Sequence, residues 1–247
     1  MLPPCILLLH PFSQMTTIST TPRAADLEAV ATVFNLLHDY YGPRQRSGQR
    51  DAVDELVLTI LSQNTSDRNS GRAFRLLKAQ FADYHSLLNA PVQEVYEVIK
   101  GAGLGNIKAP RIQAVLAEVL RRRGAFDLTF LRDLSLADAK AWLLSLPGIG
   151  PKTAACVLCF ACDMPALAVD THVHRVAQRL ALIGSKVNAD LAHDLLERAL
   201  PPEQVYEFHV NMILHGRQTC HAQRPNCEHC PLLAVCPWGQ AALQTVP

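Results

Sequence analysis

The stretch Leu146-Pro147-Gly148-Ile149-Gly150-Pro151-Lys152-Thr153 separates two segments whose apolar residues repeat with helical spacing. Glycine lets a backbone turn sharply and approach another molecule closely. Glycines placed directly before a helix leave N–H groups free at its positive end, where such groups bind phosphate without reading base sequence. A plain turn between helices needs a single glycine, so Gly148 and Gly150 favour a helix-hairpin-helix clamp on a DNA backbone.

Outward from this turn, apolar residues recur at intervals of three and four through most of the chain, as is typical of amphipathic helices. No segment shows the alternation expected of a strand. The sequence therefore predicts an all-α protein, a bundle of roughly ten short helices joined by short loops. The expected helices begin at Ala24 and then cover Asp51–Ile60, Ser66–Lys78, Lys108–Arg123, Leu136–Leu144, Thr153–Cys162, Thr171–Leu182, Asp190–Leu200 and Glu203–Leu214.

Residues 1–22 precede the first expected helix and are rich in Ser, Thr and Pro, a composition typical of disorder. Their short apolar stretch, Cys5–Leu9, lacks a basic flank and is too short for a signal peptide. No apolar run in the chain reaches the length that spans a bilayer. We therefore expect a disordered leader, with a start at Met1 or Met15, and a cytoplasmic protein without a membrane segment.

Four of the eight cysteines crowd one short loop near the C-terminus. Disulfides are disfavoured in a reducing cytoplasm, so a tight cysteine group indicates metal ligation. Structural zinc sites usually consist of two knuckles far apart in sequence, whereas this loop has the compact spacing C-x6-C-x2-C-x5-C. The spacing favours a [4Fe-4S] cluster over zinc. The four residues are Cys220, Cys227, Cys230 and Cys236.

A second group of cysteines, Cys156, Cys159 and Cys162, has the spacing C-x2-C-x2-C inside an expected helix. Positions three and six apart share one helix face, so these thiols could in principle ligate together. Their neighbours are apolar, however, and free cysteine packs well in cores as a small hydrophobic residue. We interpret this group as core and give it no ligand role.

Lys152 falls in the first turn of the helix after the hairpin. The positive end of the helix dipole disfavours an ammonium there, and burial would add to the effect. An uncharged lysine can attack carbon and form a Schiff base, whereas a solvated lysine would bind phosphate. The spacing leaves both roles open. Asp170 precedes the helix expected from Thr171, where aspartate is a good N-cap and can still direct one oxygen into a cleft.

Together these motifs resemble the endonuclease III branch of the helix-hairpin-helix DNA glycosylase superfamily. The resemblance runs from about Val53 to Trp238 and is strongest over Leu146–Leu158, Ala168–Arg175 and His215–Cys236. It implies a bilobal, all-α fold with a DNA-binding cleft between the lobes. The implied divisions are a six-helix barrel lobe at 51–164, an iron–sulfur lobe at 23–50 and 165–239, and a tail at 240–247.

The resemblance also implies roles for individual residues. Lys152 matches the catalytic lysine of the family and Asp170 its catalytic aspartate, Gly148 and Gly150 match the hairpin, and the four late cysteines match the ligands of a [4Fe-4S] cluster. The implied enzyme is a monomer, associated with the nucleoid, that acts on double-stranded DNA with damaged bases or abasic sites. It removes oxidised pyrimidines and cuts the abasic site by β-elimination through a Schiff base on Lys152.

An enzyme that acts on a base within a duplex flips the nucleotide out and must fill the gap. Family members use a polar residue after a helix and an apolar wedge from another loop. An ungapped match puts Asn64 where the family usually carries glutamine, so either Gln63 or Asn64 is expected to fill the gap. The alternative for this loop is a plain helix cap at Thr65 or Ser66. Leu104 matches the wedge.

The charge of the chain is almost balanced, with 23 basic and 22 acidic residues. Bulk charge therefore does not indicate a nucleic-acid partner, and a DNA-binding face must come from basic residues gathered on one surface. Lys108, at the end of the glycine-rich loop that contains the wedge, is expected to contact a DNA phosphate. The run Arg121-Arg122-Arg123 is interpreted as a solvated helix face.

Three other functions compete with this interpretation. An adenine-specific mismatch glycosylase of the superfamily uses a carboxylate near Leu58 or Thr59 and usually lacks the lysine; here both positions are uncharged and Lys152 is present. A thymine or uracil mismatch glycosylase of the same fold stays open. A non-catalytic iron–sulfur protein that binds DNA or carries electrons is disfavoured, because the chain retains both Lys152 and Asp170.

Overall fold

The computed structural model describes residues 24–46, 48 and 50–244. This part of the chain contains twelve α-helices, four 3-10 helices and no strand, which confirms the predicted all-α class. None of its helices is long and apolar enough to cross a membrane. The predicted leader, residues 1–22, lies outside the described residues.

The α-helices follow one another with short connections, in the order α1 Ala24–Tyr41, α2 Ala52–Ser62, α3 Asp67–Gln80, α4 Tyr84–Asn89, α5 Val92–Ile99, α6 Gly105–Arg123, α7 Leu136–Leu144, α8 Pro151–Ala161, α9 Thr171–Arg179, α10 Ala189–Glu197, α11 Val205–Gln218 and α12 Pro237–Gln244. The 3-10 helices are η1 Lys100–Ala102, η2 Thr129–Asp133, η3 Pro202–Gln204 and η4 Leu233–Val235.

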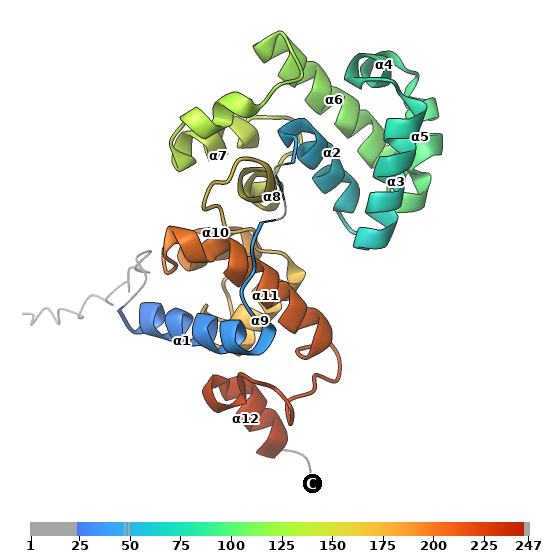
Figure 1. Ribbon diagram of the computed structural model, residues 1–247. Helices are drawn as coiled ribbons and strands as arrows, with labels where there is room; N and C mark the ends of the chain where they lie inside the picture. Colours follow the sequence, from blue (N-terminus) through green and yellow to red (C-terminus); the bar gives the residue numbers. More distant parts are fainter. Residues whose placement is uncertain (1–23, 47, 49, 245–247) are drawn as a thin grey trace, which may run out of the picture.

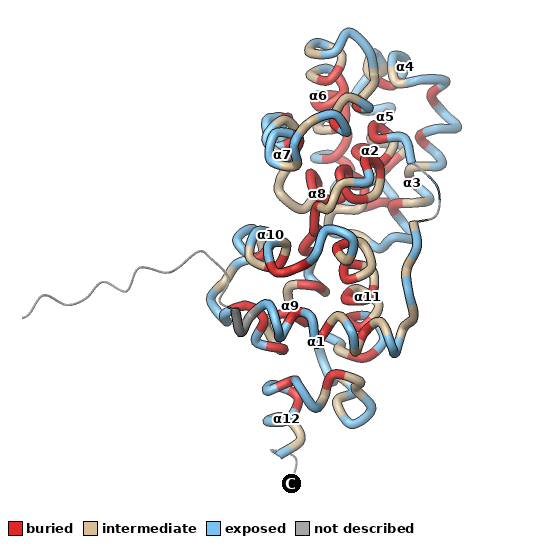
Figure 2. Tube along the Cα trace, turned by 60° about the vertical axis from the view of Figure 1, so that its left-hand side comes forward, coloured by how far each residue is buried: buried red, intermediate tan, exposed pale blue. Residues whose placement is uncertain are grey.

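The helices gather into two lobes (Figure 1). Helices α2 to α8 share one apolar core, built from buried residues between 52 and 168. Helices α1, α9, α10 and α11 share a second core, built from residues 30–37 and 167–236. The two ends of the described chain therefore meet in the second lobe. Figure 2 shows the buried segments on the inner faces of both lobes. The lobe boundaries at 50/51 and 164/165 stay a prediction.

Helix α2 is the central helix of the first lobe. Asp51 caps it, because its side chain accepts hydrogen bonds from the N–H groups of Val53 and Asp54, at 2.9 and 2.8 Å. Leu56 and Ile60 on this helix are completely buried, and the helix packs against α3 and α8. Burial of a side chain of this size contributes about 1.5–3 kcal/mol, so packing rather than the cap dominates the stability of the helix.

Polar contacts join the two lobes on either side of α8. The Nζ atom of Lys140 on α7 lies 2.5 Å from Oε1 of Glu197 on α10, and the second oxygen of Glu197 accepts from the N–H of Leu167 at 2.8 Å. On the other side, Arg217 on α11 donates to Asp67 at the start of α3, at 2.7 Å. Polar contacts thus connect the two lobes on both sides of α8.

Some elements depart from the sequence expectation. Helices α4 and α5 were not expected; they are only six and eight residues long, too short for a clear apolar period. Helix α6 begins at Gly105, so most of the loop expected to run to Lys108 is helical. Helix α12 runs to Gln244 and so extends into the predicted tail, 240–247, while residues 245–247 lie outside the description; the boundary of the tail stays a prediction.

Candidate active site

The hairpin between α7 and α8 has the geometry that its glycines suggest. Gly148 has a φ of 72°, a left-handed value that disfavours other residues, and a Cβ added there would lie 2.6 Å from Nε of Arg111. Gly150 has an ordinary φ of −104° and is the N-cap of α8. Within the described part of the chain, the N–H groups of both glycines donate to no other group. They are available to an external acceptor.

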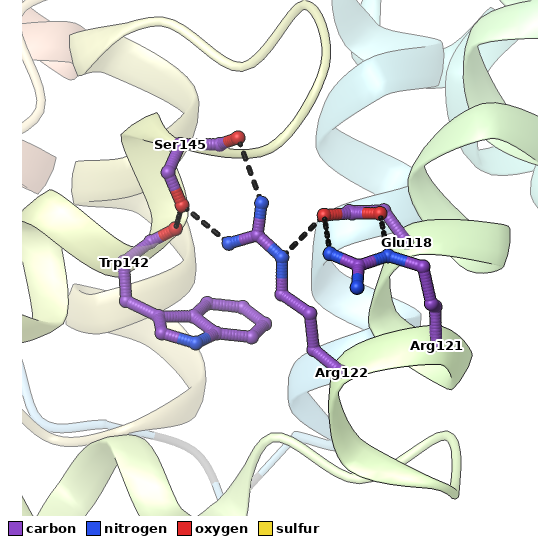
Figure 3. Close-up of polar contacts among 5 residues, drawn as sticks. All are labelled: Glu118, Arg121, Arg122, Trp142 and Ser145. Atoms are coloured by element: carbon purple, nitrogen blue, oxygen red, sulfur yellow. Dashed lines mark hydrogen bonds and ion pairs between the residues drawn. The ribbon is translucent and has the colours of Figure 1, made fainter.

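Arg122 fixes the start of this hairpin (Figure 3). Its guanidinium pairs with Glu118 on α6 and donates to Oγ of Ser145 at 2.6 Å, while it lies over the Trp142 ring. Ser145 is the residue that ends α7. The interpretation of this run as a solvated face is therefore wrong for Arg122, which connects α6 to the hairpin. Arg121, by contrast, forms an exposed ion pair with Glu118.

Lys152 and Asp170 lie on the two sides of the space between the lobes. Lys152 is the second residue of α8 and is half-buried. Asp170 caps α9, and its Oδ1 accepts from the N–H groups of His172 and Val173 at 2.9 and 2.8 Å. Both residues line the same two adjoining hollows, which form one cleft. The capping role of Asp170 is confirmed, and the structure brings the two residues together.

The cleft has an outer mouth and an inner pocket. The mouth is lined by the loop after α2 and by the start of α9, including Asn64, Thr65 and His172. The inner pocket lies behind Lys152 and Asp170; its other lining residues are Arg50, Glu55, Leu58, Thr59, Ser62, Asp67, Ser70, Gly71, Cys156, Phe160, His209, Ile213 and Arg217. Lys152 and Asp170 line both hollows and are therefore accessible to a base or sugar that occupies either of them.

Two groups beside Lys152 are held uncharged by burial. Burial raises the pKa of the Cys156 thiol to about 11, although the charge of the nearby Lys152 opposes this shift. Burial also lowers the pKa of His209, whose Nδ1 lies 2.8 Å from the carbonyl oxygen of Ala168. Cys156, Cys159 and Cys162 are all buried in accordance with their interpretation as core, and Cys156 additionally forms part of the pocket wall.

The sequence expectation missed Glu55, a carboxylate in the wall of the inner pocket. Glu55 is 5% exposed and pairs with Arg50 at 2.7 Å. A signal was present in the sequence, because Glu55, Thr59 and Ser62 lie at positions i, i+4 and i+7 of a helix whose other residues, apart from Asp54, are apolar. A polar stripe of this kind on a central helix indicates a surface that faces a cleft.

Gln63 and Asn64, the two candidates for filling the gap, differ in their surroundings. Gln63 accepts a hydrogen bond from Arg111 at 2.9 Å and donates to Oγ1 of Thr153 at 3.3 Å, so both ends of its amide are engaged. Asn64 is exposed and has a left-handed φ of 53°. Ser66 caps α3, as the alternative for this loop proposed.

Leu104 and Lys108 also differ. Leu104 is 46% exposed, and its φ of 54° places it on a strained turn directly before α6. Lys108 is 1% exposed, and its Nζ donates to the carbonyl oxygens of Leu61 and Ala102, at 2.7 and 2.9 Å. The predicted phosphate contact of Lys108 is therefore wrong. The ammonium instead satisfies carbonyl groups at the ends of α2 and η1.

The four late cysteines line one pocket of the second lobe, together with His215 and Trp238. Arg179 donates to Sγ of Cys220 at 3.2 Å, and the N–H of Gly239 donates to Sγ of Cys236 at 3.3 Å. Among residues 24–46, 48 and 50–244, no three His, Cys, Asp or Glu side chains are arranged to hold a single metal ion. The pocket gathers the four thiols, and their role as ligands of a [4Fe-4S] cluster stays a prediction.

Comparison with known proteins gives the same assignment. The family model of the HhH-GPD superfamily base excision DNA repair proteins matches residues 57–202. Endonuclease III of Bacillus subtilis is 34% identical over 187 residues, covering 75% of this chain and 81% of the relative. A relative from Arabidopsis thaliana is 34% identical over 169 residues, 68% of this chain, and the chain spans 58% of that protein's length.

Solved structures of endonuclease III with DNA match almost the whole chain. A non-covalent complex has a TM-score of 0.78 at 28% identity and covers 89% of this chain and 99% of that one. A trapped covalent intermediate has a TM-score of 0.76 at 27% identity and covers 88% and 98%. The hairpin, the cleft and these matches show that the chain belongs to the HhH-GPD superfamily of base excision DNA repair proteins and is a DNA glycosylase with endonuclease III relatives.

Proposed function

We propose that this protein is a bifunctional enzyme that removes oxidised pyrimidines from duplex DNA and then cuts the abasic site. The observation that carries the proposal is that Lys152 and Asp170, from different lobes, line the same cleft and the pocket that adjoins it. An amine in this place can reach a sugar whose base occupies the pocket. The covalent endonuclease III–DNA intermediate among the matched structures is consistent with such chemistry.

In the proposed reaction, the Lys152 amine attacks C1′ of the flipped nucleotide, and the bond from C1′ to the base breaks. Asp170 stabilises the positive charge that develops on the sugar, or accepts the proton of the lysine. The sugar ring opens to give a Schiff base. Loss of a 2′ proton then breaks the 3′ C–O bond by β-elimination. The second carboxylate oxygen of Asp170 is suited to stabilising the charge on the sugar or accepting the proton of the lysine, because the N-cap hydrogen bonds are made by Oδ1.

The DNA contacts follow from the groups that are free on either side of the cleft. The N–H groups of Gly148 and Gly150 bind a backbone phosphate at the positive end of α8. Leu104, exposed on its strained turn, enters the opposite side of the gap as the wedge. Asn64 fills the gap left by the flipped nucleotide, because its side chain is exposed, whereas the Gln63 amide is held at both ends.

Alanine substitution distinguishes the two residues of this loop. Asn64→Ala should slow base removal more than it slows cleavage at a preformed abasic site, since flipping is easier where no base has to be unpaired. Gln63→Ala should instead lower stability by about 1 kcal/mol, the effect of losing a typical hydrogen bond. A Gln63→Ala variant of native stability with the larger kinetic defect would reverse the assignment.

A [4Fe-4S] cluster held by Cys220, Cys227, Cys230 and Cys236 is proposed as the resident cofactor. The cluster supplies structural order to the loop after α11 and takes no part in the lyase chemistry. Absorbance near ~400 nm, where thiolate-bound iron clusters absorb, is the readout. Cys227→Ala should lose this absorbance and unfold the C-terminal lobe at lower temperature. A colourless native protein that contains stoichiometric zinc would refute the cluster.

The proposed function is tested with duplexes that carry single lesions and with abasic duplex. We expect strand cleavage on dihydrouracil, thymine glycol and abasic substrates, and covalent trapping of the protein on abasic DNA by borohydride. Trapping separates this enzyme from a non-catalytic iron–sulfur protein that merely binds DNA. Cleavage confined to T·G or U·G mismatches would favour a mismatch glycosylase. We further propose that the enzyme acts as a monomer on nucleoid DNA.

A further inference from the structure

The chain passes from α8 to α9, and so from one lobe to the other, as an irregular segment, residues 163–170, that ends at Asp170. Residues 166–169 of this segment are at most 2% exposed. Their side chains enter the two cores in turn, which is the alternation of an extended chain. Ala166 and Ala168 belong to the core of the first lobe, and Leu167 and Val169 to that of the second. The segment therefore helps to set where the carboxylate of Asp170 lies relative to the first lobe.

Side chains from α10 and α11 satisfy the backbone of this buried segment. Buried carbonyl and N–H groups need partners, and an irregular segment supplies few of its own. Nδ1 of His209 on α11 lies 2.8 Å from the carbonyl oxygen of Ala168, and Nδ1 of His193 on α10 lies 2.7 Å from that of Leu167. Glu197 on α10 accepts from the N–H of Leu167 at 2.8 Å. A carbonyl oxygen only accepts, so each of the two ring nitrogens carries a proton and donates it.

His209 differs from His193 because it also reaches the candidate active site. Its side chain is buried, lines the inner pocket together with Lys152 and Asp170, and packs edge-on against Phe160, with ring centroids 5.4 Å apart. His193 does not line this pocket. Burial keeps the pKa of His209 below its ordinary value, so near neutral pH the ring is uncharged and its one proton stays on Nδ1. One side chain thus joins the wall of the pocket to the backbone that leads to the aspartate.

A core histidine that merely satisfies a carbonyl group is the competing explanation. The loss of such a residue would lower stability and leave the chemistry of the folded enzyme intact. Asn211, two residues further along α11, provides the comparison. It is 1% exposed, accepts from Arg44 and donates to the carbonyl oxygen of Gly42, and it lines neither hollow of the cleft. His209 and Asn211 are therefore two buried polar residues of one helix that each hold a backbone carbonyl, one beside the site and one remote from it.

We infer that His209 is a positioning residue for Asp170, because its Nδ1–H fixes the carbonyl of Ala168, two residues before the carboxylate. This inference rests on the proposed function. The N-cap bonds of Asp170 fix its side chain to the start of α9, and the His209 bond fixes the chain that enters this cap. Without that bond the carboxylate would be free to move relative to Lys152. A misplacement of about 1 Å between reacting groups can slow a reaction about a hundredfold.

The first test compares two variants of His209 in the full chain. Asparagine can place an N–H donor where Nδ1 lies, because both nitrogens are bonded to Cγ, whereas leucine removes the donor. Under single turnover with abasic duplex and borohydride, His209→Leu should form the covalent adduct at least about tenfold more slowly than wild type. His209→Asn should remain close to the wild-type rate. An Asn variant as slow as the Leu variant would show that the donor is not what matters and would overturn the inference.

Asn211→Ala is the matched control for this comparison. It should lower the free energy of unfolding, measured with urea, because it leaves the carbonyl of Gly42 without its donor. The folded Asn211→Ala enzyme should form the adduct at the wild-type rate. If Asn211→Ala and His209→Leu slow the adduct by the same factor, the effect follows from lost stability and the positioning role is refuted.

The second test repeats His209→Leu in an Asp170→Asn background. A residue that acts through the carboxylate has little left to disturb once the carboxylate is gone, so the further loss of rate should stay within about twofold. Equal fold losses in the two backgrounds would mean that His209 acts independently of Asp170, which contradicts the inference.

The remaining outcomes separate the inference from the proposed function. If His209→Leu does not fold, His209→Gln takes its place, because its amide lies one bond further from the backbone than Nδ1, and the same results are expected of it. A wild-type protein that forms no adduct with abasic DNA would refute the proposed function, and the inference with it. A wild-type protein that forms the adduct, with an unchanged rate in the folded variant without the donor, would refute the inference alone.

Discussion

Two turns that contain glycines open helices in this protein, and each is followed by a lysine, but the two lysines have different surroundings. Lys152, the second residue of α8, lines the cleft with Asp170. Lys108, the fourth residue of α6, is buried and donates to the carbonyls of Leu61 and Ala102. The same local pattern therefore places a candidate nucleophile in one turn and a buried structural lysine in the other.

The position of each lysine in its helix explains the difference. Lys108 lies four residues before Ile112 and eight before Leu116, both completely buried, so it belongs to the inward face of α6. Lys152 precedes the buried run of α8, which begins at Thr153. A lysine at the edge of a cleft keeps access to ligands, whereas a lysine on a core face must find its partners inside.

The largest expected effect is that of Lys152→Ala. Removal of the amine should lower abasic-site cleavage at least about a thousandfold, as expected for loss of a nucleophile. DNA binding and the iron–sulfur absorbance should persist, because neither depends on this side chain. Cleavage is followed on labelled abasic duplex by denaturing gel. A variant that still cuts at the wild-type rate would remove Lys152 from the reaction.

Lys108→Met is the counterpart on the other turn. It leaves two buried carbonyls without their donor, so the free energy of unfolding should fall by about 2 kcal/mol or more. Burial lowers the pKa of this lysine, as expected for an amine without a carboxylate partner. Urea unfolding measures the change. Native stability, combined with a DNA affinity that depends less steeply on salt, would instead restore Lys108 as a phosphate contact.

Alanine substitution at the two hairpin glycines should change stability by different amounts. Gly148→Ala places a methyl group against Arg111 at a left-handed φ, which should cost about 1–2 kcal/mol of stability. Gly150→Ala has open space and an ordinary φ, so its stability should change by less than about 0.5 kcal/mol. Thermal and urea unfolding of both variants provide the comparison. Equal losses would mean that the conformation of Gly148 is not what fixes the hairpin.

The smallest expected effect concerns pH. Burial lowers the pKa of His193 and of His209 below the ordinary value of 6.5. As the pH falls below 6.5, these histidines become protonated in the unfolded chain but stay neutral in the folded protein. The free energy of unfolding therefore decreases, by at most about 1.4 kcal/mol per pH unit for each histidine. Urea unfolding between pH 7.5 and 5.5 should show a shallower loss for His193→Asn. Identical slopes would contradict the prediction.

The features that the sequence predicted are those that depend on local chemistry. The hairpin, the N-cap at Asp170 and the cap at Ser66 are set by a few neighbouring residues. The convergence of Lys152 with Asp170 was expected through the family resemblance, since eighteen residues and a change of lobe separate them. Local patterns do not contain that information.

The features that were missed depend on tertiary packing. Glu55 became part of the site because His209, Ile213 and Arg217 of α11, in the second lobe, complete the wall of the pocket that Glu55 lines. The direction of Lys108 depends on α2 and η1, which supply its two carbonyl acceptors. Helix α12 follows the cysteine loop, where apolar periodicity is weak, and Pro237 at its first position is the local sign of a helix start.

The most direct test locates the Schiff base itself. Wild-type protein is trapped on abasic duplex with borohydride, the complex is digested, and the DNA-linked peptide is identified by mass spectrometry. We predict that the adduct lies on Lys152 and that Asp170→Asn forms it far more slowly. An adduct on another amine, or strand cleavage without any adduct, would contradict the assignment of this lysine as the nucleophile.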